Sequence, residues 1–157
     1  MIYDLEFNTT LATHVQDVLD IVVQTFSQAG VTLPSRQYIT SGGTAHDCEQ
    51  VTVSFQQLYL GPPGDQAAEP QRCEAPRSAS VLVEVVRCIP SVNSRTGVPD
   101  SAAQSAFAVQ QLIDAWLLLQ AGTEMSVFGI LGDVTAGEPQ GTYQAMALSL
   151  TMTIGVA

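Results

Sequence analysis

The sequence predicts an α+β fold, a mainly antiparallel sheet of three to five strands with two helices packed on one face, in the order α-β-β-α-β. Three observations lead to this class. Apolar residues recur at helical spacing over residues 11–29 and 100–120. Residues 78–90 are rich in β-branched side chains and apolar on both faces. Residues 142–156 alternate between large apolar and small or hydroxylated side chains, which is the period of a strand.

The first helix is expected to begin at a cap formed by Thr9 or Thr10 and to end near Ala29. Gly30 suits the left-handed backbone conformation that follows many helices, and Pro34 prevents the helix from resuming. The predicted apolar face carries Leu11, Val15, Val18, Leu19, Val22 and Phe26.

The strands of the first half centre on residues 78–90. A short extended segment is expected at residues 37–40 and a full strand at residues 48–60. In the full strand the apolar parity changes at Gln56 and Gln57, which indicates a β-bulge or a twist past the edge of the core. Residues 78–90 are predicted to be the central strand, because a strand that is apolar on both faces must be covered on both.

The whole chain, residues 1–157, is predicted to be a single domain with two notable connections. Residues 61–77 hold four prolines and two glycines, and we expect a projecting arm that contacts something outside the domain. Residues 91–99 form a turn-rich crossover into the second helix. Residues 41–44, SGGT, lack the ending of a phosphate-binding loop and are expected to be a flexible loop.

The second half is expected to hold one helix and one strand. In the helix at residues 100–120, Asp114 is expected to be an exposed acid beside a core Trp116. Residues 123–141 contain four glycines and a small apolar island at residues 127–131, and residues 138–141 are expected to form a turn into the last strand. The small, hydroxylated face of the strand at residues 142–156 suits partial exposure or a subunit contact.

The charge of the chain is strongly one-sided. Fifteen acidic residues stand against five arginines, with no lysine, for a net charge of −10. This excess of negative charge argues against a surface that binds nucleic-acid phosphates. It does not argue against DNA passing close to the protein, because an acidic surface would repel DNA and let it slide. The ordinary interpretation is that the acidic residues keep the protein soluble. The N-terminal residues carry no basic leader, and no apolar run approaches the ~20 residues that span a bilayer, so no membrane partner is expected.

No catalytic, cofactor-binding or metal-binding motif is present, since GxSxG, HExxH, P-loop and GxGxxG patterns are all missing. We therefore expect a chain that is not an enzyme and uses no cofactor. His14 is expected to be a surface residue of the first helix. His46 and Cys48 lie on one extended segment, where their spacing does not favour a productive thiol–imidazole pair.

The three cysteines, Cys48, Cys73 and Cys88, show no zinc-ligand spacing and are expected to be free, largely buried thiols. An antiparallel pairing of residues 49–59 with residues 79–89 would bring Cys48 near Cys88. That proximity permits a disulfide but does not show one.

One family resemblance rests on Val85–Pro90, VVRCIP, followed by Pro99 and by a helix that contains Asp114–Trp116, DAW. With these residues the chain resembles the tail terminator proteins of long non-contractile-tailed (siphovirus-type) actinobacteriophages. The resemblance covers most of the domain, including the strand at Cys48 and the loop at Cys73. The chain length and element order are similar to those of the lambda-type tail terminator fold, and arginine as the only base fits a GC-rich coding bias.

The resemblance implies a structural virion protein. Such proteins form a hexameric ring on the head-proximal end of the tail tube, stop tube polymerisation and join the tail to the neck and head. The implied partners are further copies of the chain, the tail tube protein and a neck or head completion protein, with DNA passing transiently through the lumen. The implied location is the virion tail, after assembly in the host cytoplasm.

A ring subunit needs two different lateral surfaces, because cyclic contacts are heterologous. The candidates are the arm at residues 61–77 and the crossover at residues 91–99. The residues expected to form inter-subunit ion pairs are Arg72, Arg77, Arg87 and Arg95, although each could equally be an ordinary surface arginine. Two alternatives stay open: another head–tail joining or tail-tube protein, and a small binding module or thiol enzyme with a pocket near His46 and Cys48.

Overall fold

The computed structural model of the chain describes residues 5–43, 45–63, 76–91, 95, 97–98, 100–125 and 129–156. Within these residues the chain forms, in order, α1 (Leu5–Gln28), β1 (Arg36–Ser41), β2 (Gln50–Leu60), β3 (Pro76–Cys88), α2 (Ser101–Met125), β4 (Gly129–Ala136) and β5 (Tyr143–Val156). Residues 64–75, which include most of the expected arm, lie outside the described residues.

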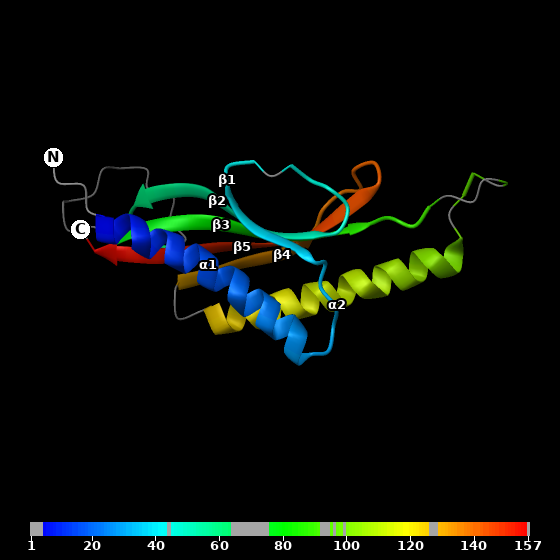
Figure 1. Cartoon of the computed structure of the whole chain (residues 1–157), viewed down its shortest axis with the longest axis horizontal. Helices are drawn as coiled ribbons and strands as arrows, with labels where there is room; N and C mark the ends of the chain where they lie inside the picture. Colours follow the sequence, from blue (N-terminus) through cyan, green and yellow to red (C-terminus); the bar gives the residue numbers. More distant parts are fainter. Residues whose placement is uncertain are drawn as a thin grey trace.

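The five strands form one mixed sheet in the order β1-β2-β3-β5-β4. β1 runs parallel to β2, and the other neighbouring pairs are antiparallel. β3 is therefore the middle strand, as its double-sided apolar sequence predicts. Both helices cross the same face of the sheet (Figure 1), so the predicted α+β class with a mostly antiparallel sheet is confirmed.

The core lies between the sheet and the two helices. In register, Val53 of β2 faces Val83 of β3, and Val83 faces Leu148 of β5. These side chains are fully buried against Val22 and Phe26 of α1 and Leu118 of α2. Burial of apolar side chains on alternate positions of three adjacent strands supplies the apolar face that amphipathic α1 needs.

The opposite face of the sheet, which we call the outer face, is covered in part by the loop at residues 42–49, described at residues 42–43 and 45–49. This loop joins β1 to its parallel neighbour β2 and passes over the outer face (Figure 1). Beneath it Gln50, Thr52 and Ser54, the outward-pointing residues of β2, are fully buried. Farther along the face, Ser149 of β5 is exposed and Thr151 is half-buried, in line with the partial exposure expected for this strand.

The sequence prediction missed one strand and shifted one register. β4 lies within residues 123–141, where only an apolar island and a turn were predicted, because Gly132 and a register shift between Leu131 and Val134 interrupt its alternation. β2 pairs with β3 from Gln50↔Val86 to Leu60↔Arg77, about two residues from the expected pairing. The bulge expected at Gln56–Gln57 is confirmed as a register shift between Phe55 and Gln57. The element order is α-β-β-β-α-β-β, with β1 and β4 added to the predicted order.

The expected orientation of α2 was wrong. Asp114 is 1% exposed and Trp116 is 70% exposed, the reverse of the prediction. The physical reason is that α2 is apolar around most of its circumference, so its periodicity does not select the buried side. Arg87 of β3 does so instead, because its guanidinium binds the Asp114 carboxylate. His14 of α1, expected at the surface, is half-buried. Over the described residues, neither helix is long and apolar enough to cross a membrane.

Candidate assembly surface and outer-face polar site

Five of the nine large apolar side chains that are exposed in the described part of the chain lie on α2. We call this set the α2 stripe; its members are Val109, Leu112, Ile113, Trp116 and Leu119, which are between 38% and 70% exposed. At about 100° per residue these side chains span roughly 120° of the helix surface. They lie on the side of α2 that faces away from the buried side chains Leu117, Leu118, Ala121 and Met125.

The surface around the α2 stripe carries almost no charge. Between Ser101 and Met125 the only ionisable side chains are Asp114, which is buried, and Glu124 near the end of the helix. The N-terminal part of α2 extends past the end of α1 (Figure 1). Exposed apolar residues scattered singly are common, whereas a stripe of them along one helix side that includes an exposed Trp is a candidate interaction site.

An internal ion pair fixes the rotation of α2. Arg87 donates from Nε to Asp114 Oδ2 at 2.6 Å and from Nη2 to Asp114 Oδ1 at 2.9 Å. The side chains are 13% and 1% exposed. Gln110 adds a third donor at 3.1 Å, and Arg87 Nη2 also reaches the carbonyl of Thr32 at 3.4 Å. A bidentate pair with these additional bonds satisfies a buried carboxylate that would otherwise be costly.

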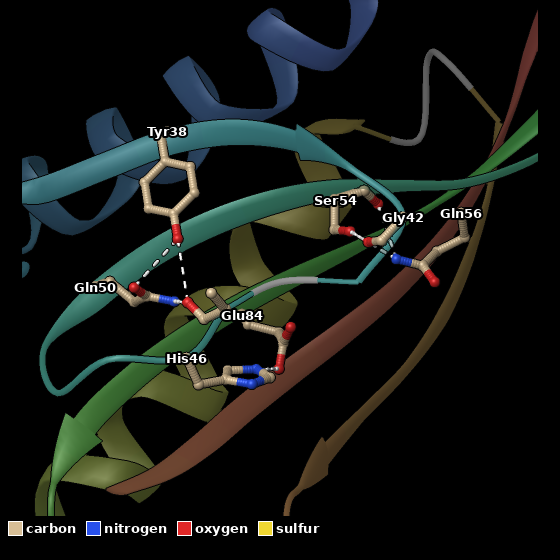
Figure 2. A network of polar contacts seen from close by, with 8 residues as sticks. Tyr38, Gly42, His46, Gln50, Ser54, Gln56 and Glu84 are labelled. Carbon is tan, nitrogen blue, oxygen red and sulfur yellow. Dashed lines mark hydrogen bonds and ion pairs between the residues drawn. The ribbon is translucent and has the colours of Figure 1, made fainter.

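A second polar site lies on the outer face, where the loop at residues 42–49 is held down. Ser54 Oγ donates to the carbonyl of Gly42 at 2.5 Å, and Gln50 Nε2 donates to the carbonyl of Ala45 at 3.2 Å (Figure 2). Tyr38 Oη lies 3.3 Å from Gln50 Oε1. Side chains of β1 and β2 thus satisfy loop carbonyls that would otherwise lose their hydrogen bonds to water.

The same loop places His46 over the central strand. His46 Nε2 lies 3.0 Å from Glu84 Oε2 (Figure 2). The imidazole stacks on the ring of Tyr143, with centroids 5.2 Å apart and an interplanar angle of 19°. These three residues line a pocket of about 360 Å³ together with Gly137, Glu138, Gln140 and Ala145. We call this the His46–Glu84 pocket.

The expected proximity of Cys48 and Cys88 is found, and both thiols are free. Burial, the hydrogen bond with Cys48, and the negative charges of Cys48, Glu49 and Asp47 raise the pKa of Cys88 from 9.0 to about 11. Cys48 donates to the carbonyl of Thr142 at 3.3 Å. Cys73 lies outside the described residues.

The arginines expected at an interface fall in different settings. Arg72 lies outside the described residues. Arg77 is half-buried at the start of β3, and Arg95 is exposed in the crossover; each takes part in a contact within the chain. The guanidinium of Arg87 is bound to Asp114, so charge reversal there would disturb the fold as well as any contact.

The described residues offer no nucleophilic pair at the positions considered for a thiol enzyme. The imidazole of His46 bonds to Glu84, whereas the Cys48 thiol bonds to Thr142. Within the described part of the chain, no cluster of three or more His, Cys, Asp or Glu side chains is arranged to hold a metal ion.

The fold and these two sites define an α+β protein with an exposed apolar helix face and a small acidic pocket. No family model matches the sequence, and no curated protein matches it.

The α2 stripe and the His46–Glu84 pocket were not predicted from the sequence. The stripe could have been found from the near-absence of charge between residues 101 and 123, whereas nothing local joins Glu84 to a loop 38 residues earlier.

Proposed function

We propose that this chain is a structural virion protein that forms a homo-oligomeric ring, a hexamer by resemblance, at the head-proximal end of a phage tail tube. In that role the ring stops tube polymerisation and joins the tail to the neck, and DNA passes through its lumen. The partners are further copies of the chain, the tail tube protein and a neck or head completion protein. The ring is a part of the virion, assembled in the host cytoplasm.

The single observation that carries the proposal is the uncovered α2 stripe. A helix that is apolar on both its inner and outer sides leaves apolar surface in contact with water until something covers the outer side. Trp116, 70% exposed at the centre of the stripe, has the size and position of an interface anchor. A protein whose work is assembly needs such a surface, and catalysis does not.

The occupant that fits the stripe best is a second copy of the chain. Two copies that each carry a net charge of −10 repel one another, so they can approach only where their contact surfaces are uncharged. The exposed side of α2 between residues 101 and 123 meets this condition for one of the two different lateral surfaces that a ring subunit needs. A basic partner would instead be expected to favour the acidic parts of the surface.

The experiment is light scattering on the purified chain across a range of concentration and salt, alone and with tail tube protein. The expected result is a hexamer, or a monomer that becomes hexameric at high concentration or when tube protein is added. High salt should strengthen assembly, because it screens the repulsion between acidic copies and leaves apolar contacts intact. A monomer that ignores concentration, salt and tube protein would overturn the proposal. A ring that binds a portal-side protein but not tube would favour the joining-protein alternative.

A further inference from the structure

We propose that the His46–Glu84 pocket is a binding site for a guanidinium group, the head of an arginine side chain. The proposal concerns the outer face of the sheet and does not depend on assembly through the α2 stripe. It follows from the position of one carboxyl group, the shape and charge of the pocket, and the aromatic ring in its wall.

The first step concerns Glu84. This residue lies on the central strand, its side chain is 10% exposed, and His46 is its only ion-pair partner among the described residues. Its neighbours across the sheet are Thr52 and Ala147, neither of which is basic. The hydroxyl of Thr52 is itself buried without a hydrogen-bond partner. A carboxylate this buried is normally paired with a full positive charge.

The second step concerns the rest of the pocket wall. Glu138 and Gln140, from the turn between β4 and β5, line the pocket together with Glu84. The two carboxyl groups make the pocket rich in hydrogen-bond acceptors, and their charge disfavours a phosphate or carboxylate ligand. None of the described arginines lines the pocket, and Arg36 pairs with Asp47 instead.

The third step separates guanidinium from other cations. Tyr143 presents an aromatic ring in the pocket, where it stacks with the imidazole of His46. A guanidinium is planar, stacks on aromatic rings and donates through a fork that matches carboxylates, whereas an ammonium is a strongly hydrated point charge. A volume of about 360 Å³ is at the small end of ligand sites and suits a side-chain head group.

The test is a titration of the full chain with n-butylguanidinium, followed through the NMR signals of the histidine rings. The chain has two histidines, so His14 on α1 is an internal reference for His46. We expect saturable shifts of the His46 signals with a Kd on the order of 1 mM, and no shift of His14. The matched control is n-butylammonium, which has the same alkyl chain and should bind at least about fivefold more weakly.

Two variants make the result specific. Glu84→Gln should weaken binding about tenfold or more, and Glu138→Gln, on the exposed turn, should weaken it about threefold. If Glu84→Gln does not fold, Glu138→Gln carries the test alone. Equal binding of both cations, a linear drift without saturation, or unchanged affinity in a folded variant would overturn the proposal.

A concentration series without added ligand identifies the source of the arginine. If a second copy supplies it, concentrating the protein alone will move the His46 signals in the same direction as n-butylguanidinium. If the His46 signals stay fixed while n-butylguanidinium still binds, the arginine comes from another molecule. Both results support the guanidinium site and differ only in the molecule that supplies the arginine.

Discussion

Arg87 on the central strand and Asp114 on α2, 27 residues apart in the sequence, form a two-point ion pair with bonds of 2.6 and 2.9 Å. The pair joins the two structural layers and determines which side of α2 faces the core. It places Leu117 and Leu118 against the sheet and leaves Trp116 in solvent. A buried polar contact thereby sets the position of an exposed apolar surface.

The first prediction is that Asp114→Asn lowers the free energy of unfolding by about 3–5 kcal/mol, because it leaves the guanidinium of Arg87 without its counter-charge. The measurement is urea denaturation followed by circular dichroism. Glu124→Gln is the matched control on the same helix and should change stability by less than about 0.5 kcal/mol, since Glu124 is exposed. The double variant Arg87→Met/Asp114→Leu should recover much of the loss, and equal stability of Asp114→Asn and wild type would contradict this account.

The second prediction concerns the α2 stripe. Trp116→Ser should weaken self-association at least tenfold in light scattering, while its unfolding free energy stays within about 0.5 kcal/mol of wild type. Leu118→Ala, two residues away on the buried side, should do the reverse and cost about 2–5 kcal/mol of stability. The idea fails if Trp116→Ser associates as the wild type does under conditions where the wild type forms oligomers.

The third prediction is that Gly132→Ala destabilises the β4 edge by about 1–3 kcal/mol. A Cβ atom at Gly132 would collide with the backbone carbonyl of Ser149 on the neighbouring strand. Gly43→Ala is the control, because a Cβ atom there meets nothing within 4 Å. Thermal denaturation compares the two, and equal melting temperatures would show that β4 lies farther from β5 than the structure places it.

The central part of the fold could be predicted from the sequence because its signals are local. β3 is apolar on both faces, and β5 alternates without interruption, so each pattern identifies its strand directly. β4 could not be predicted, since Gly132 and the register shift beside it break the alternation. The parallel pairing of β1 with β2 also has no local signal in the sequence, because it depends on the path of the loop at residues 42–49.

The sites were less predictable because they depend on contacts between distant segments. The closeness of Cys48 and Cys88 follows from antiparallel pairing alone, which tolerates an error of two residues in register. The rotation of α2 about its axis could not be predicted, because it depends on the contact between Arg87 and Asp114. Helical periodicity does not reveal that contact. His46 and Glu84 meet only because the loop folds back over the outer face.

The last prediction uses the raised pKa of Cys88, which lies at about 11 against an ordinary value of 9.0. At pH 8 its thiolate population, and hence its alkylation by iodoacetamide, should be roughly a hundredfold below that of the unfolded chain. Because folding raises this pKa, the neutral thiol stabilises the fold fully below pH 9.0, and that contribution is lost as the pH rises through about 11.

Peptide mapping by mass spectrometry gives the rate at Cys88 separately from the other thiols. The matched variant is Cys48→Ser, which removes the sulfur that contacts Cys88 while Cys88 stays partly buried. Its Cys88 should react faster than that of the wild type but more slowly than that of the urea-unfolded chain, since burial is the largest cause of the shift. A Cys88 that reacts at the unfolded rate in the native wild type would mean that neither burial nor the contact with Cys48 protects its thiol.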